Sequence, residues 1–190
     1  MKLEIDDPKL LETLVDVLNS NGVVVMPCDT IYGLVGIAPE TEDKIRSLKG
    51  RQEKSFLRLI PDLRWLPRFT DSVLPEELKA YWPGALTVIF PAGEGQTGTV
   101  ALRIPDDSLL LRVMERLGKP LFSTSVNASG QPALWRIQEI VSAFEASVDL
   151  VVAAGDRPEG VPSTIIDVTS RPYRLLRRGA VKLPDGLIKP

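Results

Sequence analysis

The sequence predicts an α/β fold, in which helices flank a mixed sheet that contains some antiparallel pairs. Candidate strands and helices alternate along all 190 residues. Since no internal repeat, low-complexity tract or linker interrupts this alternation, we expect a single domain over residues 1–190. A chain of this length buries a core without disulfides or metals, and its 44% hydrophobic and 25% charged residues are ordinary globular values.

The first part of the chain is expected to hold two helices and three short strands. Asp7 favours a helix start, and leucines then recur at helical spacing. Asn21-Gly22 is expected to end this helix. Thr41 is expected to cap a second helix that ends near Gly50. Apolar, β-branched runs predict strands at 23–26, 31–37 and 56–60.

The rest of the chain continues the same alternation. Pro75 opens a helical segment over 75–81, and a glycine-rich polar loop occupies 92–98. Asp106 is expected to cap a helix at 107–117, and another helix follows at 136–145. Strands are predicted at 85–90, 100–104, 121–124, 149–153 and 164–168, with a basic, β-like tail at 173–182.

The missing histidine and the single cysteine exclude several kinds of chemistry. The chain cannot form a Ser-His-Asp or Cys-His catalytic site or a His-ligated zinc site. Cys28 alone forms no disulfide framework and no CxxC site, and we interpret it as a small buried side chain at a strand end. An enzyme of this composition has carboxylates, hydroxyls, amines and guanidinium groups to work with.

The net charge of −2 argues against a general polycation for nucleic acid. No run of residues approaches the roughly 18 apolar residues of a membrane span, and the N-terminus carries no secretory signal pattern. We therefore expect a cytoplasmic protein that does not contact a membrane.

Two basic segments and three polar turns predict a pocket for a small anion. Residues 44–58 and 171–190 each hold six basic residues against one acidic residue. Hydroxyl-rich turns at 29–33 and 123–130 follow predicted strands, and Ser163 precedes one. Taken singly, such groups serve as solvated faces, helix caps and turns. Together they favour an anionic ligand such as a nucleotide, although no Walker or GxGxxG motif is present.

Seven segments in order resemble the YrdC/YciO family, the threonylcarbamoyl-AMP synthases of tRNA modification. They read MPCDTIYGLVG, KGR, WPGALTVIF, TVALRIP, LFSTSVNASGQP, PSTIID and LLRRGAV, and they span most of residues 26–181. The length corresponds to the short form of the family. The resemblance implies a twisted α/β sheet with a concave basic face that holds the site.

The resemblance also implies a reaction. L-threonine, bicarbonate or CO₂, and ATP give threonylcarbamoyl-AMP and pyrophosphate, with Mg²⁺ held mainly by the phosphates and water and not by a metal site of the protein. The carbamoyl group then passes to tRNA with the help of the t6A transfer proteins. Since the nucleophile comes from threonine, the absence of histidine is compatible with this chemistry.

Motif positions assign a role to each candidate site residue. Lys49 and Arg51, the family's K-x-R pair, are expected to clamp the triphosphate as catalytic residues. The expected contacts with threonine come from Thr30, Arg103, Ser123 and Ser163. The expected contacts with ATP come, besides the K-x-R pair, from Ser55, Thr99, Ser125, Asn127 and Arg177, with Arg178 as the rival of Arg177.

The segment after the K-x-R pair departs from the family pattern. The family usually has a proline there and then a lysine or asparagine, a small residue and leucine, whereas this chain has QEKSFL at 52–57. This departure keeps a second hypothesis open, a non-catalytic YciO-type paralogue that binds nucleotide, double-stranded RNA or tRNA. A carbamoyl-transfer module of the hydrogenase-maturation type is a weaker third reading.

Overall fold

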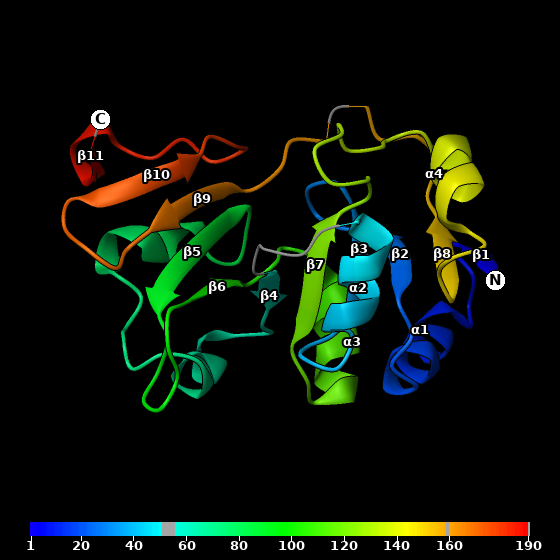
Figure 1. Cartoon of the computed structure of the whole chain (residues 1–190), viewed down its shortest axis with the longest axis horizontal. Helices are drawn as coiled ribbons and strands as arrows, with labels where there is room; N and C mark the ends of the chain where they lie inside the picture. Colours follow the sequence, from blue (N-terminus) through cyan, green and yellow to red (C-terminus); the bar gives the residue numbers. More distant parts are fainter. Residues whose placement is uncertain (51–55, 159, 190) are drawn as a thin grey trace.

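The protein is built on one mixed sheet of eleven strands, in the order β1-β8-β2-β3-β7-β4-β6-β5-β9-β10-β11 (Figure 1). The structure is a computed structural model that describes residues 1–50, 56–158 and 160–189. The strands are β1 (Lys2–Glu4), β2 (Val24–Pro27), β3 (Tyr32–Ile37), β4 (Leu57–Leu59), β5 (Leu86–Pro91), β6 (Thr99–Arg103), β7 (Leu121–Ser125), β8 (Leu150–Ala153), β9 (Thr164–Asp167), β10 (Tyr173–Arg177) and β11 (Ile188–Lys189). The predicted α/β class with antiparallel pairs is confirmed.

The helices lie on both sides of one half of the sheet. They are α1 (Leu10–Asn19), α2 (Glu42–Lys49), α3 (Ser108–Leu117) and α4 (Ile137–Phe144), with 3₁₀ segments η1 (Leu63–Arg68), η2 (Glu76–Tyr81) and η3 (Asp185–Leu187). In Figure 1 the α-helices gather around strands β1, β8, β2, β3 and β7. No helix in the described ranges is long and apolar enough to cross a membrane.

Strands β8, β2 and β3 are covered on both faces, as are Leu121 and Phe122 at the start of β7. Leu14 of α1 and Val113 of α3 pack in one core cluster with Val24 and Val35. The opposite cluster brings α2 and α4 against the alternate side chains of these strands, including Leu34 and Val25. Because both faces are buried, every residue of β2, β3 and β8 is buried.

The other half of the sheet has one buried face and one open face. Leu86, Val88 and Phe90 of β5 pack with Leu66 of η1 and Leu78 of η2 in a third core cluster. Side chains alternate along a strand, so the residues between them point to the opposite face. No α-helix in the described part packs on that face, and it forms a wall of the cavity described below.

The ends of the elements differ in detail from those expected. Helix α3 is capped by Asp107 and not by Asp106, since Asp107 Oδ1 accepts from the Leu110 N–H at 3.0 Å. Thr41 precedes α2 as expected, but its hydroxyl donates to the Ile37 carbonyl at 2.8 Å. Helix α1 begins at Leu10, after a turn in which the Asp7 carboxylate accepts from the Lys9 N–H. The segment predicted as a helix after Pro75 is the 3₁₀ segment η2.

Candidate active site

A cavity of about 640 Å³ lies between the two halves of the sheet. Its lining comes from the turn after β2, from β3, β4 and β7, and from the open face of β5, β6, β9 and β10. The pairing of β7 with β3 and β4 places Ser123 opposite Val35 and Leu57, in the middle of the sheet. Polar groups from distant parts of the sequence therefore meet at one place.

The open face of the sheet supplies the floor of the cavity. Thr87 and Ile89 of β5 line it, whereas their neighbours Leu86 and Val88 belong to the core. On β10 both Leu176 and Arg177 line the cavity, and a shift in the β9–β10 register falls between Leu175 and Arg177. Such a bulge turns two successive side chains toward one face, which strict alternation would not allow.

Arg103 lies at the inner end of the cavity with its guanidinium group held on several sides. Its side chain is 4% exposed and forms an ion pair with Asp29. Its Nε donates to the Gly84 carbonyl at 2.8 Å, and its Nη1 donates to the Thr30 hydroxyl at 3.3 Å. The group thus has a fixed orientation in a region shielded from water.

Ser163 connects a second arginine to the open face of the sheet. The Thr87 and Ser163 hydroxyl oxygens are 2.8 Å apart. Arg177 donates from Nε to the Ser163 carbonyl at 2.9 Å and from Nη2 to its hydroxyl at 3.0 Å. Partial removal from water, and then the charge of Arg103, lower the pKa of Arg177. Within the described part of the chain its hydrogen bonds go to neutral groups, so it brings positive charge to the cavity.

Lys49 holds the polar turn that follows β7. It ends α2, is 3% exposed, and donates from Nζ to the Ser125 carbonyl at 2.7 Å and to Asn127 Oδ1 at 2.5 Å. The Ser125 hydroxyl donates to the same Asn127 oxygen at 2.6 Å. The next residue, Gly50, has φ of 58°, which suits glycine at a helix end. These contacts set the Lys49 ammonium group behind Ser125 at the edge of the cavity.

Cys28 and Gly33 form a tightly packed part of the wall. A Cβ atom on Gly33 would lie 3.0 Å from Cys28 Sγ and 3.1 Å from Ser123 Oγ. Burial, with the nearby charges of Asp107 and Asp29, raises the pKa of the Cys28 thiol to about 12. Cys28 is therefore a protonated thiol at neutral pH and not a nucleophile, which agrees with the buried role expected for it.

The structure brings most of the expected site residues together. Those that line the cavity are Thr30, Thr99, Arg103, Ser123, Ser125, Ser163 and Arg177. Lys49 and Asn127 adjoin it through Ser125. Arg51 and Ser55 lie outside the described residues. Arg178, the rival of Arg177, is exposed, as Arg177 is, but it is not part of the lining.

The sequence assigned no role to Asp29, which pairs with Arg103, or to Thr87 of the lining. A threonine inside the apolar strand 85–90 was the available signal for Thr87. Tyr32, which follows Thr30 in the same motif, is buried away from the cavity, and its hydroxyl donates to the Gly155 carbonyl at 2.9 Å.

Only part of the two basic segments points to the cavity. Arg46 pairs with Glu42 on α2, and Arg174 pairs with Asp167 on the neighbouring strand. The Asp167 carboxylate also accepts from the backbone N–H and the hydroxyl of Thr169 and so anchors the turn after β9. The positive charge of the described cavity lining therefore comes from Arg103 and Arg177.

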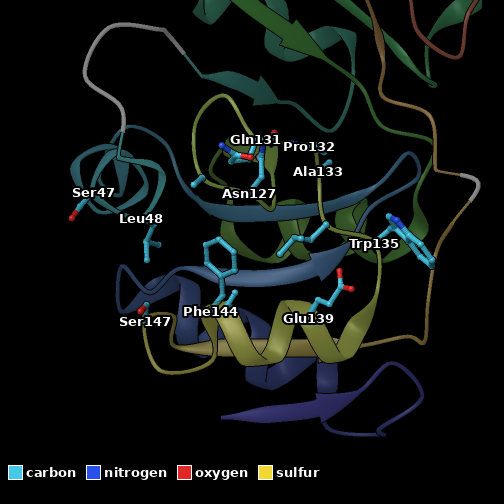
Figure 2. A pocket seen from close by; sticks show the side chains of 13 residues that line it. Ser47, Leu48, Asn127, Gln131, Pro132, Ala133, Trp135, Glu139, Phe144 and Ser147 are labelled. Atoms are coloured by element: carbon cyan, nitrogen blue, oxygen red, sulfur yellow. The ribbon is translucent and has the colours of Figure 1, made fainter.

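A larger cavity, of about 960 Å³, lies beside this site (Figure 2). Helices α2 and α4 and the loop 127–135 surround it, and Figure 2 shows Leu48, Trp135 and Phe144 around it. Among the described residues, its lining includes Glu139 but no arginine or lysine. Since an anionic substrate needs positive charge or several donors, the smaller cavity is the better candidate site.

The described residues offer no ready-made metal site. No group of three or more His, Cys, Asp or Glu side chains among them is arranged to hold a metal ion. The neutral oxygens of Ser125 and Asn127 are the polar groups next to Lys49, and they suit Mg²⁺ only when other ligands supply the negative charge.

Comparison with known proteins identifies relatives that carry this fold. The threonylcarbamoyl-AMP synthase of Bacillus subtilis is 31% identical over 195 residues, covering 95% of this chain and 56% of the relative. The synthase of Pyrococcus abyssi is 30% identical over 177 residues, covering 86% and 52%. The chain thus spans about half the length of these curated relatives.

Solved structures agree with the sequence relatives. P. abyssi Sua5 complexed with L-threonine superposes with a TM-score of 0.82 at 26% identity, covering 94% of this chain and 57% of that one. E. coli YciO has the same TM-score at 24% identity and covers 96% of both chains, which shows a shared fold. Residues 16–179 match the family model described as "Telomere recombination", that of the Sua5, YciO and YrdC proteins. The chain belongs to the Sua5/YciO/YrdC family.

Proposed function

We propose that this protein is an L-threonylcarbamoyladenylate synthase, a nucleotidyltransferase that acts in the t6A modification of tRNA. The observation that carries the proposal is the cavity in which Arg103, Arg177 and a set of hydroxyl groups converge. The names of the relatives in Bacillus subtilis and Pyrococcus abyssi support it, as does the threonine complex of Sua5.

Threonine binds at the inner end of the cavity in this proposal. A carboxylate accepts two parallel N–H groups from an arginine, and Arg103 is the buried arginine of the lining. The hydroxyls of Thr30, Ser123 and Ser163 supply neutral donors and acceptors around the amino acid. A buried site with such fixed partners favours a small polar substrate over water.

ATP binds along the outer side, toward Lys49 and Arg177. Phosphate oxygens accept from the Arg177 guanidinium and from the hydroxyls of Thr99 and Ser125. Lys49 holds Ser125 and Asn127 on this side and adds positive charge behind them. Arg51 and Ser55 belong to the same proposed ATP set by their motif positions. Ser125 and Asn127 would offer neutral oxygens to a Mg²⁺ ion held mainly by the triphosphate and water. When bound, the ion neutralises phosphate charge.

The chemistry needs positioning more than a protein nucleophile. The threonine amine loses a proton and forms an N–C bond with CO₂, and an oxygen of the resulting carbamate then attacks the α-phosphorus of ATP. The bond from the α-phosphorus to the bridging oxygen breaks, and pyrophosphate leaves. The protein contributes orientation and stabilisation of phosphate charge, which agrees with a chain that has no histidine and a protonated Cys28.

Pyrophosphate release from labelled ATP tests this function. We expect release only when L-threonine and bicarbonate are both present, and we expect the product to serve the t6A transfer proteins and tRNA in the cytoplasm. Release without threonine, or no release with all substrates, would contradict the proposal.

A second candidate function is that of a nucleotide- or RNA-binding paralogue without synthase activity. The observation in its favour is Phe56, a bulky buried side chain in the cavity wall where the family pattern has a small residue. Its ring packs against Phe122, with centroids 5.7 Å apart. This candidate predicts salt-dependent binding of tRNA or double-stranded RNA together with no pyrophosphate release, so filter binding at two salt concentrations beside the synthase assay separates the two.

A further inference from the structure

Asp29 is a buried carboxylate whose contacts are concentrated on one oxygen. Its side chain is 9% exposed. Its Oδ2 accepts from Arg103 Nη2 and, at 3.0 Å, from the backbone N–H of Asp106. Its Oδ1 is buried without a hydrogen-bond partner within the described part of the chain. Burying an unpaired carboxylate oxygen is costly, so an arrangement that keeps one calls for a functional explanation.

The contacts of Arg103 show what Asp29 achieves. A guanidinium group carries five N–H donors, and three of those of Arg103 have protein acceptors, on Gly84, Thr30 and Asp29. Within the described part of the chain, one N–H on Nη1 and one on Nη2 have no protein acceptor. Two N–H groups are what a carboxylate needs for paired recognition. The protein contacts therefore orient the guanidinium and leave two N–H groups that can donate to a bound carboxylate.

The same pair also changes the charge at this end of the cavity. Asp29 neutralises Arg103, whereas Arg177 donates to the neutral groups of Ser163. A neutralised arginine attracts a ligand by directed hydrogen bonds and little by net charge. A highly charged phosphate group gains less there than at Arg177, because its attraction depends on charge.

We propose that Asp29 is a positioning residue that makes the Arg103 end of the cavity specific for a carboxylate and unfavourable for phosphate. The inference rests on the proposed function and deepens it, since it states how one cavity directs an amino acid to Arg103 and a triphosphate to Arg177. Asp29 itself does not touch the substrate. It acts through the orientation and the charge of Arg103.

Two substitutions separate the charge of Asp29 from its position. Asp29→Asn keeps the shape and an acceptor oxygen but removes the negative charge. We expect it to weaken L-threonine binding about tenfold and to tighten the binding of inorganic phosphate about fivefold. Asp29→Glu keeps the charge but moves the carboxylate by one methylene. We expect weaker threonine binding with phosphate binding as in the wild type.

Titration calorimetry of the full chain with L-threonine alone and with inorganic phosphate alone measures both effects. Asp167→Asn is the matched control, because Asp167 is also a buried carboxylate paired with an arginine, and it is not part of the cavity lining. We expect its threonine and phosphate affinities to equal those of the wild type.

The outcomes distinguish a failure of the proposed function from a failure of the inference about Asp29. If the wild type does not bind L-threonine, the proposed function fails. If the wild type binds L-threonine, and Asp29→Asn binds both L-threonine and inorganic phosphate with the affinities of the wild type, the inference alone fails. Should Asp29→Asn not fold, Asp29→Glu decides: threonine binding at the wild-type level, or a parallel loss of threonine and phosphate binding, overturns the positioning role.

Discussion

The two halves of the sheet bury their side chains in different ways. Strands β2, β3 and β8 are sandwiched between α1 and α3 on one face and α2 and α4 on the other, and all of their residues are buried. Strand β5, in the other half, sends Leu86 and Val88 into a core and Thr87 and Ile89 toward the cavity. One half therefore stabilises the fold on both faces, and the other uses one face for stability and one for the site.

This division explains where the polar groups are. A hydroxyl or guanidinium group on a doubly covered strand would have to be buried without water, at a cost. On the open face, Thr87 and Arg103 reach a cavity, and their partners come from turns at the border of the two halves. The site lies where the covered half ends because there a strand can carry both apolar and polar side chains.

The largest effect should come from cutting a core side chain in the doubly covered half. Leu34→Ala in β3 should lower the free energy of unfolding by about 2 to 5 kcal/mol, because Leu34 is fully buried and its truncation leaves a cavity. Ile89→Ala on the open face should lower it by less, since Ile89 is only partly buried. Urea unfolding followed by tryptophan fluorescence measures both. Equal losses would contradict the division of the sheet.

An intermediate effect should come from the arginine of the open half. Arg177→Ala should reduce kcat/KM about 10- to 100-fold, since hydrogen bonds to a charged group contribute about 1.5 to 3 kcal/mol. Arg178→Ala is the matched control, because Arg178 is the exposed neighbour outside the cavity lining. Steady-state kinetics with threonine, bicarbonate and ATP measures the difference. If both variants lose activity to the same extent, the assignment of Arg177 is wrong.

The last prediction concerns Cys28, at the border of the two halves. Its thiol has an ordinary pKa of 9.0, raised to about 12 in the folded protein. Iodoacetamide reacts with the thiolate, so alkylation at pH 8 should be much slower in the native protein than in urea. The same shift stabilises the fold below pH 9 and is progressively lost as the pH rises from 9 toward 12, because the unfolded chain ionises first. Equal alkylation rates in the two states would contradict this burial.

The sequence predicted the covered half of the fold more completely than the edges of the sheet. Helices α1 and α4 and strands β2 and β8 follow from apolar periodicity, because their burial dictates the pattern. Strands β1 and β11 were not expected, since strands of two or three residues at a sheet edge leave no periodic signal. The cap of α3 was placed one residue early, as only the three-dimensional turn distinguishes Asp106 from Asp107.

For the site, the motif positions predicted most of the polar side chains in the lining but not the hydrogen bonds among them. Thr30, Arg103, Ser163 and Arg177 line one cavity, as the family resemblance implies. The role of Asp29 was not visible, because its partner Arg103 lies 74 residues away and their contact exists only once β6 stands near the turn after β2. Contacts of this kind depend on the order of strands, which local patterns do not specify.

A crystal structure of the protein with L-threonine and ATP tests the central claim most directly. The account predicts threonine between Thr30, Arg103 and Ser163, with its carboxylate on Arg103, and the triphosphate toward Lys49 and Arg177. Threonine bound instead in the neighbouring cavity between α2 and α4, or phosphates seated on Arg103, would contradict it.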